Sequence, residues 1–255
     1  MADRDRPPPN LAQPRDLGAI MGDALRLGRA HPGVFVLSAF IVVAVVDLLV
    51  LGVGQGQLTS YDDSRPWGWQ AAVTIAYILV VTPLVTAVHV TAVRDAGGGR
   101  RPALGRSMSA AFEVFPLLLG VVVINLLGVV VGLALLIAPG IYLFVRWALA
   151  CQVAVAEEVP RPADALRRSW ELIEGSWWRV LGIILVTTIL GNLVGVIIAL
   201  PFEVAASEAE SGPLSLIGGI VGSTIGLSFA ALTSTLLYFD LAARRRRPLT
   251  PPPPL

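Results

Sequence analysis

Four polar side chains lie inside long apolar stretches of this sequence, where an ionisable or hydrogen-bonding group is costly. They are Asp47, Asn125, Arg146 and Asn192. Along helices that rise ~1.5 Å per residue, Asp47, Arg146 and Asn192 each lie roughly 16–18 Å from the same arginine-rich side, and Asn125 lies slightly lower. An unpaired arginine at mid-bilayer costs at least about 2.5 kcal/mol on insertion scales. We therefore expect a buried contact between Asp47 and Arg146, with an amide supplied by Asn192.

Two roles fit such a polar cluster. In the favoured role it ties helices together in one register. In the alternative it is a site for an ion or an anionic headgroup, which would make the protein a small transporter or channel. A proton relay is disfavoured because no histidine lies at that depth, and His89 is only five residues from Arg94. One histidine without a neighbouring acid or thiol does not form a metal site, so no metal and no other cofactor is expected.

Catalytic residues are scarce. Two histidines and the single cysteine, Cys151, provide no arrangement of nucleophile, base and acid. Glu157 and Glu158 are adjacent, but consecutive residues of a helix point apart, so they fit an interfacial hinge better than a catalytic pair. We expect a non-enzymatic protein, and an enzyme embedded in the membrane is the disfavoured alternative.

Membrane-spanning helices are the elements that must position these residues. The chain of 255 residues is 55% hydrophobic and 15% charged, whereas a soluble domain carries about 25% charged residues. Its apolar blocks have the length that crosses a hydrocarbon core about 30 Å thick. In lipid each backbone polar group must be satisfied within its segment, which favours helices. The six expected spans are 34–53, 69–93, 116–138, 141–156, 180–200 and 214–243.

The connections between these spans alternate in arginine content, and all 19 basic residues are arginine. The positive-inside rule therefore predicts that both termini lie in the cytoplasm, with an even number of spans. The composition is typical of a GC-rich bacterium, which predicts the bacterial inner membrane. Residues 1–15 and 244–255 are expected to be disordered tails that flank a membrane domain over 16–243. The basic run of the second tail could hold anionic lipid headgroups through Arg244, Arg245, Arg246 and Arg247.

An amphipathic stretch precedes each odd-numbered span. The stretches begin near Leu17, Leu104 and Leu166, with apolar residues at i, i+3, i+4 and i+7 spacing. Helices of this kind lie in the plane of the headgroups. The predicted fold class is therefore an all-α polytopic bundle of six transmembrane helices with three cytoplasmic interfacial amphipathic helices.

Glycines at four-residue spacing indicate where the predicted spans approach one another, because small residues let helix backbones come close in lipid. These glycines are Gly128, Gly132, Gly191, Gly195, Gly218, Gly222 and Gly226.

The most specific motif of the sequence is PGIYLFVRWALACQVAVAEE followed by ADALRRSWELIEG. It resembles the membrane-domain family of glycerophosphoryl diester phosphodiesterases, through Pro139–Tyr142, Val145–Arg146, Glu157 and Ala165–Trp170. This resemblance implies a six-span helical membrane domain, which some relatives join to a soluble phosphodiesterase barrel. The chain contains no such barrel, so phosphodiesterase activity is not expected. We expect instead a membrane module that engages membrane lipids, a partner membrane protein or a second copy of itself, and no nucleic acid.

Overall fold

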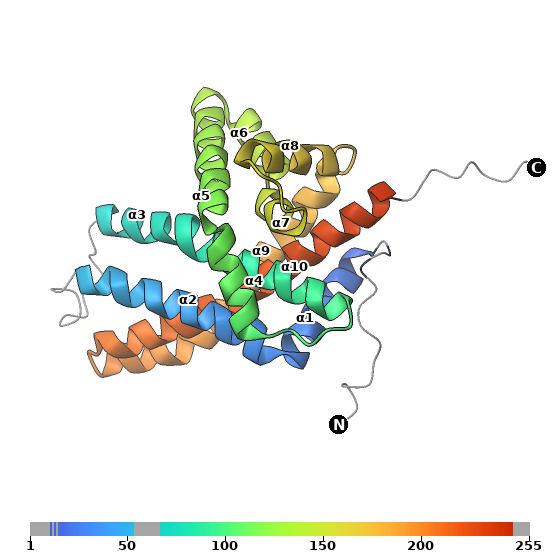
Figure 1. Ribbon diagram of the computed structural model, residues 1–255. Coiled ribbons are helices and arrows are strands. Elements are labelled where there is room, and N and C mark those ends of the chain that lie inside the picture. Colours follow the sequence, from blue (N-terminus) through green and yellow to red (C-terminus); the bar gives the residue numbers. More distant parts are fainter. Residues whose placement is uncertain (1–10, 12, 14, 54–66, 247–255) are drawn as a thin grey trace, which may run out of the picture.

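The computed structural model describes residues 11, 13, 15–53 and 67–246. Within this part the chain folds into helices without a strand, which confirms the predicted all-α class (Figure 1). In chain order the elements are α1 (Leu17–Ala30), α2 (Pro32–Val53), α3 (Trp67–Ala76), the π-helical segment η2 (Tyr77–Val81), α4 (Thr82–Gly97), α5 (Leu104–Leu135), α6 (Ile137–Arg146), α7 (Ala150–Ala156), α8 (Pro162–Ile173), α9 (Trp177–Glu208) and α10 (Gly212–Arg246).

Six helical segments of the described part are long and apolar enough to cross a bilayer, as the sequence predicts. The chain is therefore a multi-pass integral membrane protein. The six segments are Pro32–Leu49, Ala71–Gly97, Leu104–Leu135, Ile137–Ala156, Trp177–Glu208 and Gly212–Arg245.

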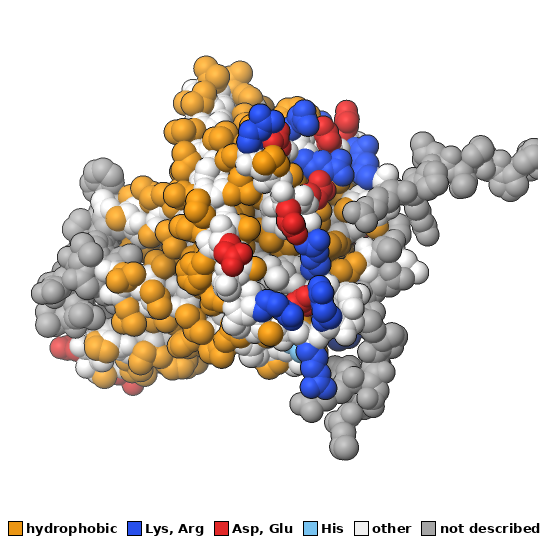
Figure 2. Space-filling view, viewed as in Figure 1, with side chains coloured by type: hydrophobic (Ala, Val, Ile, Leu, Met, Phe, Trp, Pro, Cys, Tyr) orange, Lys and Arg blue, Asp and Glu red, His pale blue; other side chains and the backbone are white. Residues whose placement is uncertain are grey.

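Two apolar arms leave a common base in different directions. One arm contains α2, α3 and the hairpin of α9 and α10, and the other is the hairpin of α5 and α6 (Figure 1). Arginine side chains gather over the base, away from the tips of both arms, whereas acidic side chains are also visible at the tip of the arm that contains the hairpin of α9 and α10 (Figure 2). The base is called the arginine-rich side below.

Of the three predicted interfacial helices, α1 and α8 are separate helices and the second is not. Residues 104–115 belong to α5, which continues without a break through Pro116 to Leu135. No helix boundary therefore separates the predicted interfacial stretch from the predicted span at Pro116. A proline inside a membrane helix is tolerated because neighbouring groups compensate for the missing backbone hydrogen bond.

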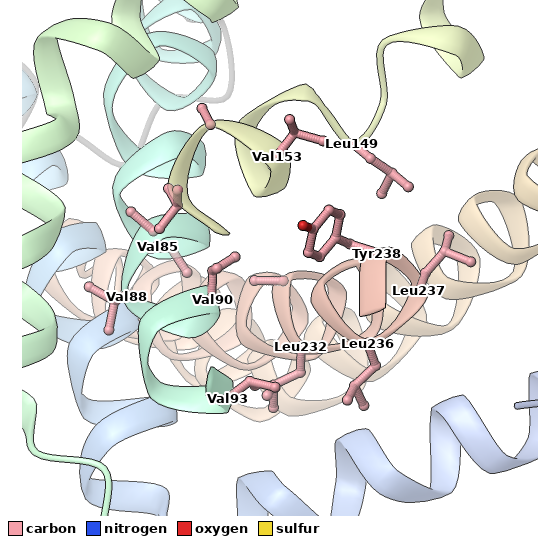
Figure 3. Close-up of a cluster of buried hydrophobic side chains, with 14 of the residues drawn as sticks. Val85, Val88, Val90, Val93, Leu149, Val153, Leu232, Leu236, Leu237 and Tyr238 are labelled. Carbon is pink, nitrogen blue, oxygen red and sulfur yellow. The ribbon is translucent and has the colours of Figure 1, made fainter. Parts of the chain in front are cut away.

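The core lies where α4 crosses the second half of α10. Every residue from Pro83 to Val90 is buried, so α4 is covered on all of its faces. Figure 3 shows Val93 of α4 beside Leu232 of α10, with Leu149 and Val153 on the side of α7, above Tyr238 of α10.

The predicted tails lie mostly outside the described residues. Their described ends are ordered parts of the base: Arg15 is buried, and α10 continues to Arg246. The second predicted tail therefore begins inside a helix.

Candidate functional site

A groove with a volume of about 410 Å³ lies between α9, α10 and the π-helical segment η2. Small and polar residues make up most of its lining. From α9 come Thr187, Thr188, Gly191, Asn192, Gly195, Val196 and Ala199; from α10 come Gly219, Gly222, Ser223, Gly226, Leu227 and Ala230; Tyr77 completes it. Ligand pockets of proteins have volumes of roughly 300–1,000 Å³, so the groove is large enough to hold part of a small molecule or lipid.

The floor of the groove is made by glycines that bring α9 and α10 into backbone contact. A Cβ atom at Gly195 would lie 2.8 Å from the Gly222 carbonyl oxygen, and one at Gly222 would lie 2.6 Å from the Gly195 carbonyl oxygen. Gly191 and Gly226 face each other in the same way, with the corresponding distances at 3.1 and 2.8 Å. These four glycines therefore set the closest approach of the two helices.

The remaining predicted packing glycines also lie at close helix contacts. Gly128 faces the indole of Trp147, and a Cβ atom at Gly132 would lie 2.9 Å from the Gly140 Cα atom. Both contacts join α5 to the segment that follows it. A Cβ atom at Gly218 would lie 2.6 Å from the Phe202 Cβ atom, near the tip of the hairpin of α9 and α10.

Some hydrogen-bond donors and acceptors in the groove have no partner within the described structure. The Asn192 amide donates to the Thr188 carbonyl oxygen at 2.8 Å, which leaves its second N–H and its own oxygen for another group. The Thr187 side chain is 4% exposed, and its hydroxyl has no hydrogen-bond partner in the described structure. A buried hydroxyl without a partner costs about 1–3 kcal/mol, so an occupant that bonds it would recover that energy.

Tyr77 connects the groove to Asp47 of α2. Its hydroxyl lies 3.0 Å from each oxygen of the Asp47 carboxylate, and Tyr77 lines the groove together with Ser223. Within the part of the chain that the structure describes, Asp47 has no cationic partner and Tyr77 is its only donor. The carboxylate therefore stands at the edge of the groove with only a phenol to stabilise it.

The π-helical turn at Tyr77 has a local cause in Pro83. A proline in the middle of a helix has no N–H to donate, and its ring crowds the carbonyl four residues earlier, here that of Leu79. The helix widens just before this point, where the Thr82 N–H donates to the Tyr77 carbonyl five residues back. Single π-helical turns inside α-helices recur at functional sites.

The expected contact between Asp47 and Arg146 does not form, and the four predicted polar residues do not make one cluster. Arg146 lies in the other arm, at the end of α6. Its Nε and Nη2 atoms donate to the Tyr142 hydroxyl at 3.0 and 2.7 Å, and its Nη1 atom donates to the Trp170 carbonyl oxygen at 3.1 Å. The guanidinium also lies 4.6 Å from the ring centroid of Trp170 and 5.1 Å from that of Tyr142. Equal residue counts along separate predicted spans therefore did not bring the two charges together.

Asn125 stabilises a break in the fourth predicted span. The helix is interrupted between Arg146 and Ala150, so carbonyl groups there lack their usual helical donors. The Asn125 amide donates to the Trp147 carbonyl oxygen at 3.3 Å, and the Ser169 hydroxyl donates to the Arg146 carbonyl oxygen at 2.9 Å. These side chains satisfy backbone groups, as a segment in hydrocarbon requires.

Glu157 and Glu158 form the bend between α7 and α8, at the place where a hinge is predicted. Glu158 has a φ angle of 51°, which is rare for a residue other than glycine. The Glu157 carboxylate accepts hydrogen bonds from Arg168 at 3.0 Å and from the Tyr238 hydroxyl at 3.1 Å. Arg94 pairs with Glu158 at 3.0 Å. The bend is thus fastened to α4, α8 and α10.

A buried ionic cluster around Asp240 was missed by the sequence reasoning. Asp240 has no exposed surface, and its carboxylate accepts from the Arg15 backbone N–H at 2.6 Å, from Arg179 at 2.6 Å and from Arg244 at 3.0 Å. The signal that could have found it is an acidic residue four positions before an arginine near the end of the last span, a spacing that lets the two pair on one helix.

The predicted headgroup arginines also make protein contacts. Arg244 bonds Asp240 and the Arg15 carbonyl oxygen, and Arg245 donates to carbonyl oxygens of α8. The side chain of Arg246 and all of Arg247 lie outside the described residues.

His89 is a residue of the protein core. It is fully buried, with Nδ1 2.7 Å from the Val85 carbonyl oxygen and Nε2 3.1 Å from the Ser228 hydroxyl. Both ring nitrogens therefore have partners within the helices, one in α4 itself and one in α10.

The chain matches no protein-family model, no curated protein and no solved structure. The resemblance to the phosphodiesterase membrane-domain family therefore stays a prediction from its sequence motifs.

Proposed function

We propose that this integral membrane protein is non-enzymatic and binds a neutral lipid that carries a hydroxyl or carbonyl group in the groove between α9, α10 and η2. The observation that carries this proposal is a group of hydroxyl and amide side chains in the lining of a groove that is otherwise mostly apolar. Hydroxyl and amide groups of Thr187, Thr188, Asn192 and Ser223 face a space bounded by spanning segments. Such groups hold a ligand by hydrogen bonds.

The position of the groove along α9 favours a neutral occupant. Asn192 is the sixteenth of the 32 residues of α9, so it lies near the middle of the span. A charged group at mid-bilayer costs at least about 2.5–3.5 kcal/mol, which disfavours a phosphate headgroup there. A lipid alcohol or ester can lie at that depth and exchange hydrogen bonds with the lining.

The lining also favours an occupant that enters from the side. Thr188, Asn192 and Val196 are exposed and lie at four-residue spacing on one face of α9. In a bilayer an exposed face at this height borders on acyl chains. A lipid can therefore reach the groove without passing through water.

Thr187→Val and Asn192→Leu are each expected to weaken neutral-lipid binding about fivefold. The reason is that each removes hydrogen bonds with a net value of about 1 kcal/mol. The measurement is native mass spectrometry of the full chain titrated with diacylglycerol, with phosphatidylcholine as the comparison lipid. Leu193→Ala is the matched control, because Leu193 is exposed on α9 and lies outside the groove lining. Equal loss in the control, or equal binding of both lipids by the unmodified chain, would refute the proposal.

The Asp47 carboxylate favours a second candidate function, transport of a proton or a small cation. It lies in a predicted span, half-buried, and the described residues provide it with no cation. If the protein is such a transporter, proteoliposomes containing it will carry a proton or monovalent-cation flux, and Asp47→Asn will reduce that flux to the level of empty vesicles. The isosteric amide keeps a partner for Tyr77 but cannot hold the charge. Absence of flux from the unmodified protein would exclude this candidate.

We infer that the arginine-rich side faces the cytoplasm of a bacterial cell. The positive-inside bias of the connections supports this orientation. It would leave both termini inside.

A further inference from the structure

Two arginines donate hydrogen bonds to backbone carbonyl oxygens at the C-terminal end of α8. Arg146 donates to the carbonyl oxygen of Trp170 at 3.1 Å. Arg245, from the end of α10, donates to the carbonyl oxygens of Glu171 and Glu174 at 2.8 and 2.7 Å. Because the three carbonyl groups lie within residues 170–174, where α8 ends, both guanidinium groups lie at the same helix end. We call this pair the α8 arginine site.

Positive charge exceeds negative charge at the α8 arginine site. The C-terminal end of a helix carries the equivalent of roughly half a negative charge, whereas the two guanidinium groups carry two positive charges. In the described part of the chain neither arginine forms an ion pair with a carboxylate. The neighbouring Glu171 carboxylate is taken by Arg167 and Arg168. The Glu174 side chain is exposed and is the acidic group that an anionic ligand would have to displace or avoid.

Hydrogen-bond donors remain free on both arginines. A guanidinium has five N–H groups. Arg146 makes three hydrogen bonds, and Arg245 makes its two through a single nitrogen, Nη2. Arg146 is also held in a fixed orientation between the rings of Tyr142 and Trp170. A fixed guanidinium with spare N–H groups is suited to bidentate binding of phosphate.

The surroundings of the site are those of a membrane interface. The Trp177 ring stacks on Tyr142 with centroids 6.0 Å apart, and Trp178 packs edge-on against Trp177 at 4.7 Å. Trp178 is 80% exposed. Exposed indole rings favour the headgroup level of a bilayer, where the ring is solvated by both lipid and water.

We propose that the α8 arginine site binds the phosphate of an anionic phospholipid. Arg146 and Arg245 donate hydrogen bonds to the phosphate, and Trp178 inserts among the neighbouring lipids. The site is separate from the groove between α9 and α10, and the inference does not depend on neutral-lipid binding. This proposed binding differs from a general attraction of arginines to the membrane surface, because it depends on two particular side chains, Arg146 and Arg245.

Arg146→Gln and Arg245→Gln are each expected to lower the enrichment of phosphatidylglycerol over phosphatidylcholine about fivefold, and the double variant about 25-fold. These factors follow from roughly 1 kcal/mol per arginine near an anionic surface. The measurement is native mass spectrometry of the full chain released from nanodiscs that contain both lipids. Arg167→Gln is the matched control, because Arg167 lies on α8, is 77% exposed and contacts Glu171 only at 3.8 Å.

Unchanged enrichment in Arg245→Gln and in the double variant, or an equal loss in Arg167→Gln, would overturn the proposal. Binding of inorganic phosphate that is lost in Arg245→Gln, without enrichment of phosphatidylglycerol in the unmodified chain, would show that the site takes free phosphate and not a phospholipid. Arg146 also fastens α8, so thermal unfolding of each variant is compared with that of the unmodified chain. If Arg146→Gln unfolds, Arg245→Gln decides the outcome alone. Diacylglycerol binding is expected to be unchanged in these variants, which separates this test from that of the groove.

Discussion

Gly222→Ala is expected to lower the free energy of unfolding by about 2–3 kcal/mol, the size of effect that overpacking produces in a close-packed interior. The new methyl carbon would lie 2.6 Å from the Gly195 carbonyl oxygen and 3.1 Å from the Ala199 Cβ atom. Backbone cannot rotate away as a flexible side chain can, so α9 and α10 would have to separate along their whole contact. The measurement is reversible unfolding in detergent, followed by circular dichroism.

Gly219→Ala provides the matched control on the same helix. A Cβ atom at Gly219 meets no atom within 4 Å. Alanine has a higher helix propensity than glycine by up to about 1 kcal/mol, so this variant is expected to be as stable as the unmodified chain or slightly more stable. If the two variants show the same stability, close backbone contact does not hold α9 and α10 together. Because Gly222 also lines the groove, neutral-lipid binding should weaken in Gly222→Ala as the two helices separate.

Asp240→Asn is the second change with a large expected effect, about 3 kcal/mol of lost stability. Removing one partner of a buried ionic group costs about 3–5 kcal/mol, because the opposite charges remain without compensation. Here the carboxylate has no exposed surface, while Arg179 and Arg244 keep 30% and 42% of their side-chain surface, which reduces the loss to the lower end of that range. The loss should appear as a lower midpoint of thermal unfolding and as faster proteolysis near Arg15.

The control for Asp240→Asn is Asp164→Asn, which breaks an ion pair at the surface of α8. Arg161, its partner at 2.9 Å, is 76% exposed. Exposed pairs contribute about 0–1 kcal/mol, so the control should change stability little. A loss in Asp240→Asn no larger than that of the control would mean that the cluster does not fasten α1, α9 and α10 together.

The two stability predictions concern the two ends of the same helix. Gly222 and Gly226 join α10 to α9 within the arm, and Asp240 joins α10 to Arg15 and Arg179 at the base. The groove lies against the first contact and the α8 arginine site lies close to the end of α10 through Arg245. The geometry of both proposed lipid sites therefore depends on the two contacts that fix the position of α10.

Part of the candidate site could be predicted from the sequence. Glycines at four-residue spacing indicated where α9 and α10 approach each other, and Asn192 was identified as a polar group within a span. Tyr77, Thr187 and Ser223 were not identified, because a hydroxyl in an apolar helix is ordinary until its neighbours are known. The π-helical turn that places Tyr77 beside Asp47 depends on Pro83, whose effect on side-chain direction does not follow from hydropathy.

The sequence by itself determined that this chain is helical and embedded in lipid, since the length and hydropathy of six segments follow directly from the cost of placing backbone and side chains in hydrocarbon. Which helices meet was decided only by the tertiary structure. Counting residues along unbroken helices places Asp47 and Arg146 at similar depths, yet the fourth span is interrupted after Arg146. The Arg146 guanidinium lies against the end of α8, while Asp47 meets a tyrosine in another arm. Depth depends on the position of a residue in its own helix, whereas contact depends on how helices pack, and packing is set by the shapes of many side chains together.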